Sequence, residues 1–339
     1  MTGKWAGTAI VMFAMVSVGL AQDVAPIAAT TATPPAAPSA APGAAVEKLE
    51  GRVSLSGAWA LYPMAVRWGE EFKKLHPKVQ FDISAGGAGK GMTDALAGAV
   101  DIGMVSRSLA AVEIEKGAFG LAVAKDAVVP MISRKNPLAS RLARSGVKKE
   151  TLQGIWINTS VTTWGQVAGS ASKAPIHVYT RSDSCGAADT WAVYLGGKQE
   201  NLKGIGVYGD PGLGEALRKD AVGIGYNNVN FAYDAKTKKP VEGMLALPID
   251  VNGNGVLDTN ENVYATRDTI CAAIARGDYP SPPARDLYFV TKGRPDNKLV
   301  KAFLEWTLKD GQKFVGESGY VEVLPEHIQD GLARIQGAK

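Results

Sequence analysis

From residue 53 onward the chain alternates short strand-like runs with amphipathic helical stretches, and this alternation limits the possible folds more than any other feature. Val53–Ser56, Val79–Ser84 and Asp101–Ser106 are three of these runs, and helical patterns follow the first two. Repeats of strand, turn and helix predict parallel strands joined by crossover helices. We therefore expect two α/β lobes joined by two crossings. The first lobe would comprise residues 47–130 and 284–339, and the second would comprise residues 131–283.

The charge of the chain argues against a nucleic-acid partner. Lys and Arg number 37, Asp and Glu number 33, and the formal net charge is +4. So small a surplus, without a block of consecutive basic residues, cannot supply the attraction that nucleic-acid binding needs. The sequence holds only 3 His residues, which argues against a metal or acid–base site built from clustered imidazoles.

The amino terminus has the pattern of a secretory signal peptide. Lys4 precedes an apolar run over residues 9–20, and small residues follow where a signal peptidase would cut. The run has 12 residues, whereas a membrane-spanning helix needs about 20. We therefore expect residues 1–21 to be removed on export. Residues 22–46 consist mostly of Ala and Pro, a composition typical of an extended linker without a core of its own.

Three segments share one design, in which a strand ends, small residues turn the chain and a helix begins. They are Ser56–Leu61, Gly86–Gly91 and Arg181–Ala187. A helix N-terminus presents unpaired N–H groups and the positive end of the helix dipole, so it favours an anion. Ligands of open α/β sheets also bind beyond the carboxyl ends of the strands. Arg107 and Arg181 add planar guanidinium groups that suit a tetrahedral oxyanion.

At these residues the sequence resembles the periplasmic phosphate-binding proteins of ABC importers, the PstS type. The resemblance is carried by Leu55–Pro63, Gly98–Arg107, Ile155–Val167, Arg181–Gly186, Ala221–Tyr226 and Leu287–Gly293. It implies the type II periplasmic-binding-protein fold, whose two lobes close around a desolvated oxyanion. It also implies a monomeric periplasmic receptor, without enzymatic activity, that delivers inorganic phosphate or a related oxyanion to a membrane permease. No cofactor is implied for binding.

The resemblance further implies roles for single residues. Arg181 corresponds to the arginine that grips phosphate, Asp183 to the acidic partner of its guanidinium, and Gly186 to a backbone donor at a helix start. The expected oxyanion site comprises Ala60, Leu61, Gly89, Ser106, Arg107, Arg181, Asp183, Cys185, Gly186 and Ala187.

Several of these positions depart from the family pattern. Ala60 and Leu61 lack the hydroxyl of the first turn, Cys185 and Ala187 stand in place of Ser and Thr, and Ser106 stands in place of Asp. A buried carboxylate accepts the proton of monohydrogen phosphate and repels sulfate, which carries no proton. Because Ser106 can accept that bond but repels nothing, we expect a phosphate site with altered selectivity.

The two cysteines leave alternatives open. An exported chain can form a disulfide, and only Cys185–Cys271 is possible, although two free thiols are the default expectation. Cys185 follows Arg181 at a helix start, where a thiol could have a lowered pKa and act as a nucleophile. No base lies near it in the sequence, so we interpret Cys185 as a weak S–H donor that faces the ligand.

Residues 250–261 form a second, independent motif that matches the 12-residue calcium loop of EF-hands. Oxygen-bearing side chains occupy positions 1, 3, 5, 9 and 12, Gly occupies position 6, and position 7 offers a backbone carbonyl. The ligands would be Asp250, Asn252, Asn254, Val256, Asp258 and Glu261. A polar Asn/Gly turn is the alternative. We expect a single structural Ca²⁺ in an insertion of the second lobe.

Two other functions remain open from the sequence. A secreted phosphomonoesterase could use the same anion pocket, but it would need an activated nucleophile and, normally, metal ions. A calcium-braced envelope interaction module would account for the linker and the 250–261 loop, but it would leave the three anion-type turns unexplained.

Overall fold

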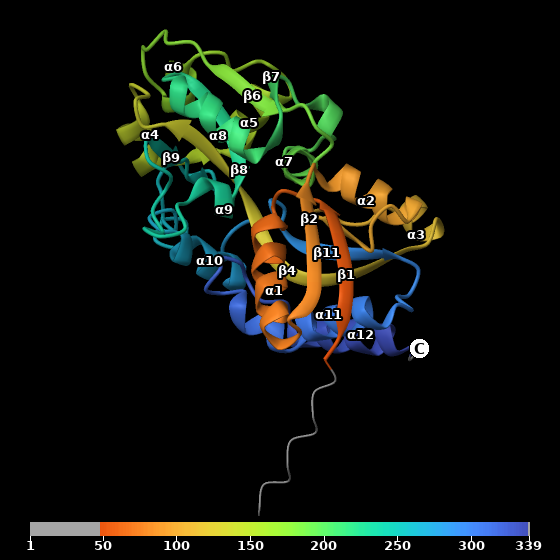
Figure 1. Cartoon of the computed structure of the whole chain (residues 1–339). Helices are drawn as coiled ribbons and strands as arrows, with labels where there is room; N and C mark the ends of the chain where they lie inside the picture. Colours follow the sequence, from red (N-terminus) through yellow and green to blue (C-terminus); the bar gives the residue numbers. More distant parts are fainter. Residues whose placement is uncertain (1–47, 338–339) are drawn as a thin grey trace, which may run out of the picture. The chain divides into compact units, whose positions relative to one another are not determined.

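The computed structural model describes residues 48–337 (Figure 1). The predicted signal peptide, residues 1–21, and the predicted linker, residues 22–46, lie outside the described residues. The described residues belong to one compact unit. Within residues 48–337, no helix has both the length and the apolar character that crossing a membrane would require.

One mixed sheet of nine strands organises this unit. Its strand order is β2-β1-β3-β11-β4-β8-β6-β7, and β9 pairs with β4. A separate ladder joins β10 to β5. The strands are β1 (Glu50–Gly57), β2 (Lys78–Ala85), β3 (Ile102–Val105), β4 (Ala118–Ser133), β5 (Val147–Lys148), β6 (His177–Arg181), β7 (Ile205–Val207), β8 (Gly223–Asn228), β9 (Met244–Ala246), β10 (Ile249–Asp250) and β11 (Ala284–Lys292).

The long strand β4 runs through both halves of the sheet (Figure 1). Up to Ala127 it pairs with β11, and from Val128 it pairs with β8. The chain returns to the first half at Ala284, the first residue of β11. These two passages are the two crossings that the sequence predicts, so the expectation of two α/β lobes joined by two crossings is confirmed.

Buried side chains form two hydrophobic clusters, one on each side of this partner change. One cluster draws on β1–β3, the first part of β4, β11 and the last helices, and the other draws on residues 127–284. The exact lobe boundaries given above stay predictions. Helix α1 shows why these segments fold, because Met64, Trp68 and Phe72 recur at four-residue spacing and are all buried.

The helices cover the sheet and complete the two cores. They are α1 (Tyr62–Leu75), α2 (Ala88–Ala97), α3 (Ala111–Glu115), α4 (Ala139–Ser145), α5 (Lys149–Trp156), α6 (Trp164–Ala168), α7 (Gly186–Tyr194), α8 (Gly209–Lys219), α9 (Val229–Ala232), α10 (Arg267–Arg276), α11 (Lys298–Leu308) and α12 (Pro325–Gln336), with the short 3₁₀ helices η1 (Gln199–Asn201) and η2 (Asp310–Phe314).

Candidate functional site

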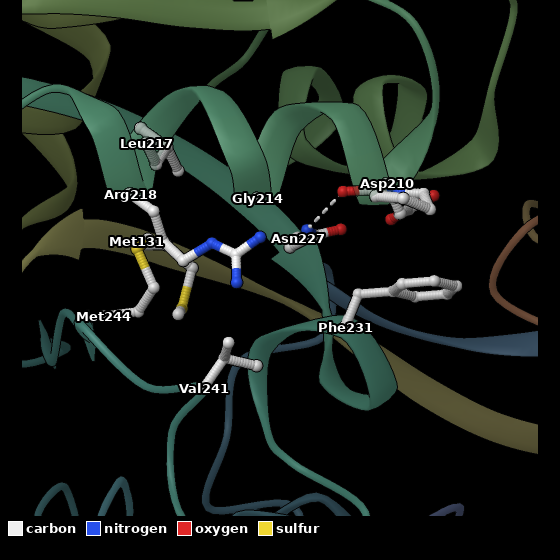
Figure 2. Close-up of a pocket in the computed structure, with 10 residues that line it drawn as sticks. Met131, Asp210, Gly214, Leu217, Arg218, Asn227, Phe231, Val241 and Met244 are labelled. Atoms are coloured by element: carbon white, nitrogen blue, oxygen red, sulfur yellow. Dashed lines mark hydrogen bonds between the residues drawn. The ribbon is translucent and has the colours of Figure 1, made fainter.

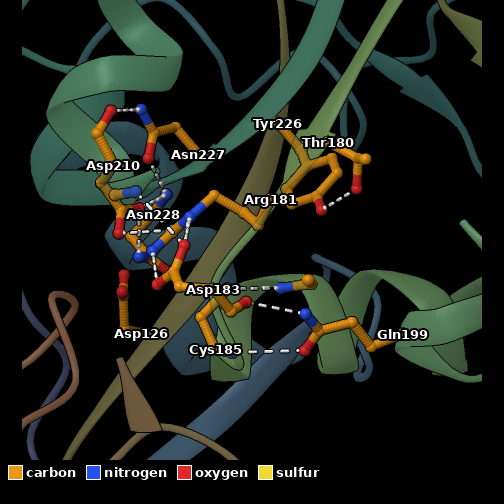
Figure 3. A network of polar contacts seen from close by, with 12 residues as sticks. Asp126, Thr180, Arg181, Asp183, Cys185, Gln199, Asp210, Tyr226, Asn227 and Asn228 are labelled. Carbon is orange, nitrogen blue, oxygen red and sulfur yellow. Dashed lines mark hydrogen bonds and ion pairs between the residues drawn. The ribbon is translucent and has the colours of Figure 1, made fainter. Parts of the chain in front are cut away.

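A buried arginine held by two carboxylates is the centre of the candidate site (Figure 3). Arg181, at the end of β6, donates from Nε to Asp183 Oδ1 at 2.7 Å and from Nη2 to Asp183 Oδ2 at 2.5 Å. Its Nη1 donates to Asp210 Oδ2, in the first turn of α8, at 2.7 Å. The side chain of Arg181 is only 1% exposed. The guanidinium is therefore fixed in one orientation.

The electrostatics of this group follow from its burial and its two partners. Burial alone would lower the pKa of Arg181, but the negative charge of Asp210 and the bonds to Asp183 outweigh it and raise the pKa. The guanidinium therefore stays charged at any physiological pH. It has five N–H donors, and three of them donate to the carboxylates. Two N–H groups remain that can donate to a ligand.

A second buried arginine continues the network at the crossing between the two halves. Arg285 donates from Nε to the Ser106 carbonyl at 3.1 Å and from Nη2 to Asn228 Oδ1. Asn228 in turn donates to Asp210 Oδ1 at 2.5 Å. These hydrogen bonds connect Ser106, which follows β3, to Asp210, which binds Arg181.

Asp126 faces Arg285 from the neighbouring strand, where the two residues are register partners. Its Oδ2 lies 3.9 Å from Arg285 Nη1, which is too far for a hydrogen bond. Asp126 is 1% exposed. Burial raises the pKa of Asp126 to about 6, although the charge of Arg285 opposes this rise.

Sequence reasoning missed Asp126, Asp210, Asn228 and Arg285. Asp126 offered a signal, because it is a charged residue inside an otherwise apolar strand-like run. Asp210 and Arg285 offered no such signal in the sequence. Asp210 contacts Arg181 from a distant helix, and Arg285 is linked to Asp210 only through Asn228.

Two of the three helix starts that the sequence singled out, those of α2 and α7, meet in the structure. Gly89 N–H donates to the Ser184 carbonyl at 3.1 Å. A Cβ atom on Gly89 would lie 2.4 Å from Ser184 Oγ, and one on Gly186 would lie 2.2 Å from the Ser106 carbonyl oxygen. Both positions therefore require glycine. The structure brings Gly89, Ser106 and Gly186 together, although the sequence places them far apart.

A cavity of about 470 Å³ opens beside the start of α7, and three of the expected residues line it, namely Arg107, Arg181 and Cys185. Arg107 does not present a free charge there. Its Nη1 and Nη2 donate to the two carboxylate oxygens of Glu113 at 2.9 and 2.7 Å. The Glu113 carboxylate raises the pKa of Arg107. Arg107 can therefore contribute only the N–H groups that Glu113 leaves unused.

Ala60 and Leu61 lie in the turn before α1 and do not line this cavity. The Ala60 carbonyl accepts a bond from the Tyr320 hydroxyl at 2.7 Å. Leu61 N–H donates to the Ala58 carbonyl at 3.1 Å, so that amide is used within its own turn. Ala187 is buried in the first turn of α7, where helix N–H groups have no partner in the preceding backbone.

Cys185 caps α7 with its sulfur atom. Sγ accepts the N–H of Ala188 at 3.3 Å. The turn before it is held by Gln199, which accepts from Cys185 N–H at 3.2 Å and donates to the Asp183 carbonyl at 2.7 Å (Figure 3). Burial raises the pKa of the Cys185 thiol to about 12. The thiol is therefore protonated at neutral pH, which argues against a nucleophile.

The two cysteines are not joined in the structure. Cys185 is buried, and Cys271 is a partly buried free thiol whose Sγ donates to the Gly319 carbonyl at 3.4 Å. Two free thiols were the default expectation from the sequence.

The residues of the calcium-type motif lie in the connection between β10 and α10, away from Arg181. Asp250 and Glu261 are buried, at 2% and 4% exposure. Within residues 48–337, no group of three or more His, Cys, Asp or Glu side chains is arranged to hold a metal ion.

A smaller pocket of about 170 Å³ lies beside α8 (Figure 2). Its lining is mainly apolar, with Met131, Leu217 and Met244 around it and Asp210 at one end. Arg218 and Asn227 also line it, and Arg218 is paired with Glu215. Asp210 already bonds to Arg181 and Asn228. An apolar lining of this kind does not suit a small dianion, so we do not assign the oxyanion to this pocket.

Comparisons with known proteins identify the family of the chain and relatives with a similar fold. A family model described as the PBP superfamily domain matches residues 29–310. The chain is 28% identical over 281 residues to the phosphate-binding protein PstS of Bacillus subtilis, covering 82% of both chains.

Two solved structures share the fold. One is a substrate-binding protein from Clostridium perfringens, assigned to a phosphate ABC transporter and solved with bound phosphate. It has 24% identity and a TM-score of 0.64, and the match covers 81% of this chain and 100% of that one. The other is an ABC-type phosphate transport receptor from Vibrio cholerae, with 18% identity, a TM-score of 0.58 and coverage of 80% and 100%.

Proposed function

The chain belongs to the PBP superfamily, and on this premise we propose that it captures inorganic phosphate, or a closely related tetrahedral oxyanion, for an ABC importer. The predicted two-lobed periplasmic-binding-protein fold agrees with the solved structures that it resembles. The observation that carries the proposal is the buried Arg181 in a cavity beside the N-terminus of α7, against which the start of α2 packs through the bond from Gly89 N–H to the Ser184 carbonyl. Buried guanidinium and main-chain N–H groups together are the donors that a tetrahedral oxyanion needs.

The anion is held by directed hydrogen bonds rather than by an excess of positive charge. Asp183 and Asp210 more than neutralise Arg181, so the three side chains together carry one negative charge. They fix the guanidinium so that its two remaining N–H groups point in a set direction. Inside a site closed to water, such charge-assisted bonds are stronger than at the surface. This arrangement favours an anion with several acceptor oxygens over one that offers charge alone.

Closure of the two halves completes the site. Gly89 N–H reaches the Ser184 carbonyl, and Gly186 lies against Ser106. Each of these contacts joins a segment of the first half to a segment of the second. We infer that they belong to the closed form and that β4, where it changes partners after Ala127, is a pivot of the motion.

The names of the relatives support phosphate as the ligand and an ABC importer as the partner. PstS of Bacillus subtilis is named a phosphate-binding protein, and the Vibrio cholerae structure is named an ABC-type phosphate transport receptor. For this chain we propose a periplasmic, monomeric receptor that releases its ligand to a membrane permease. A secreted phosphomonoesterase is not favoured, because the raised pKa of Cys185 leaves its thiol protonated.

Calorimetric titration of the purified protein with phosphate, arsenate, sulfate, molybdate and tungstate tests the proposal. We expect phosphate and arsenate to bind at one site per chain. Binding of none of the five anions would refute it. A parallel assay with p-nitrophenyl phosphate separates the receptor from an esterase. We expect no release of nitrophenol, and catalytic turnover that survives purification would favour the enzyme instead.

A further inference from the structure

The loop between β10 and α10 carries a complete set of calcium ligands that the proposed function does not use. Residues 250–261 place Asp, Asn, Asn, Asp and Glu at positions 1, 3, 5, 9 and 12 of the loop. Gly255, at position 6, has a φ of 82°, which is a conformation that glycine adopts without strain. Ca²⁺ prefers oxygen ligands at this spacing.

The carboxylates at the two ends of the loop are turned inward. Asp250 and Glu261 are 2% and 4% exposed. Asp250 accepts from the N–H groups of Gly253 and Gly255, both at 2.8 Å. Glu261 Oε1 accepts from the N–H groups of Val251 and Asn252 at 2.8 and 3.1 Å. Each carboxylate oxygen has a further lone pair, so both side chains can still bind a cation.

The middle of the loop gathers around Asp258. Its Oδ2 accepts from the Nδ2 atoms of Asn252 and Asn254 at 2.7 and 3.0 Å. The Oδ1 atom of Asn252 accepts from Asn254 N–H at 2.9 Å, and that of Asn254 accepts from Val256 N–H at 2.8 Å. The side-chain oxygens of both asparagines therefore accept from the backbone of the loop itself. The carboxylate of Asp258 therefore has two neutral amide N–H groups as partners, and a cation in their place would offset its charge.

The loop carries three carboxylates, those of Asp250, Asp258 and Glu261, and the lysine that contacts the loop does not offset their charge. Lys148 Nζ donates to the Gly253 carbonyl and not to a carboxylate. Buried carboxylates without a positive partner are costly. A divalent cation would remove this cost.

We propose that residues 250–261 bind one Ca²⁺ through Asp250, Asn252, Asn254, Asp258, Glu261 and the carbonyl of Val256. Two independent observations carry the proposal: the ligand spacing of the sequence, and the burial of two end carboxylates that point into the loop. Binding of Ca²⁺ replaces the two amide hydrogen bonds of Asp258 by a bond to the cation. Because those hydrogen bonds are lost, the affinity is modest. We place Kd on the order of 10⁻⁴–10⁻³ M, as in other extracellular modules.

The bound ion would brace the second lobe and take no part in oxyanion binding. Asp250 belongs to β10, which pairs with β5, and Leu257 N–H donates to the Arg144 carbonyl at 3.4 Å. Closing the loop therefore ties α4, β5 and the chain leading to α10 together. The calcium site is distinct from the oxyanion site, and either can exist without the other.

The test is the melting temperature of the purified protein, stripped with EGTA and then titrated with CaCl₂. MgCl₂, with ionic strength held constant, is the comparison. We expect a rise of about 3 °C at ten times Kd, which goes on growing with the logarithm of the calcium concentration. The CaCl₂ concentration that gives half of this 3 °C rise is the calcium midpoint. We expect a smaller response to Mg²⁺, which demands octahedral geometry. No response up to 20 mM CaCl₂ would overturn the proposal, and so would equal responses to the two cations.

Three variants locate the ion. Glu261→Gln should move the calcium midpoint at least tenfold higher, whereas Glu242→Gln, an exposed residue outside the loop, should leave it unchanged. Because Glu261 also holds backbone N–H groups, the exposed ligand variant Asn254→Ala serves as a second test that does not disturb buried bonds. We expect at least a fivefold weaker response from it. Wild-type midpoints in both ligand variants would place the ion elsewhere and refute the assignment.

Discussion

Replacing Asp126 by Asn should stabilise the protein, and the gain should depend on pH. Asp126 lies at the crossing, fully buried beside Arg285. Burial raises the pKa of its carboxyl group from 3.8 to about 6. The ionised carboxylate is therefore less favourable in the folded chain than in the unfolded one, even with Arg285 as a neighbour. Asn imitates the protonated carboxyl in shape and charge, so the variant avoids this cost.

The size of the effect follows from the shift in pKa. At 1.36 kcal/mol per pH unit, the rise to about 6 corresponds to about 3 kcal/mol. Because the folded chain keeps the proton more tightly, this carboxyl lowers the stability of the wild type as pH rises from about 4 to about 6. The free energy of unfolding of Asp126→Asn should exceed that of the wild type by about 3 kcal/mol at pH 8 and by about half as much at pH 5.

Urea unfolding followed by tryptophan fluorescence, at pH 5 and pH 8, measures both values. Taking the difference between variant and wild type at each pH removes the titration of the other groups. An equal difference at the two pH values would refute the reasoning. A variant that is less stable at pH 8 would also refute it, because it would show that the pair of Asp126 and Arg285 contributes net stability.

Three further predictions concern the site itself. Arg181→Lys should weaken phosphate binding at least 100-fold in calorimetry, since one ammonium cannot bridge Asp183 and Asp210. Arg181→Ala should in addition lower the free energy of unfolding by about 3–5 kcal/mol, because two buried carboxylates lose their partner. Unchanged affinity in the Lys variant would contradict the assigned site. Ser106→Asp should raise the phosphate-to-sulfate affinity ratio at least tenfold, because the carboxylate accepts a proton from phosphate and repels sulfate, and an unchanged ratio would show that selectivity arises elsewhere. Native Cys185 should resist alkylation by iodoacetamide at pH 8, where its thiol is protonated and buried; rapid modification without unfolding would contradict this.

Local patterns predicted the elements of the fold well. Apolar runs bounded by small residues located β1, β2 and β3, and the turn from Arg181 to Ala187 was placed correctly between a strand and a helix. The pairing of Arg181 with Asp183 was also accessible, because the two residues are close in sequence and lie in a motif shared with a known family.

The rest of the site depends on contacts that no local pattern records. Asp210 reaches Arg181 from the start of α8, and Arg285 arrives from β11. The sequence suggested Arg107 as an added charge, but a bidentate pair with Glu113 occupies it. Glu113 lies only six residues after Arg107, so this neutralisation is a local contact, unlike the long-range contacts of Asp210 and Arg285.

The measurement that bears most directly on the central claim is a crystal structure of the protein grown with phosphate. We expect one tetrahedral anion between the N-termini of α2 and α7, within about 3 Å of the Arg181 guanidinium and of main-chain N–H groups at the start of α7. A cleft that holds only solvent at saturating phosphate, or an anion bound away from Arg181, would contradict the account.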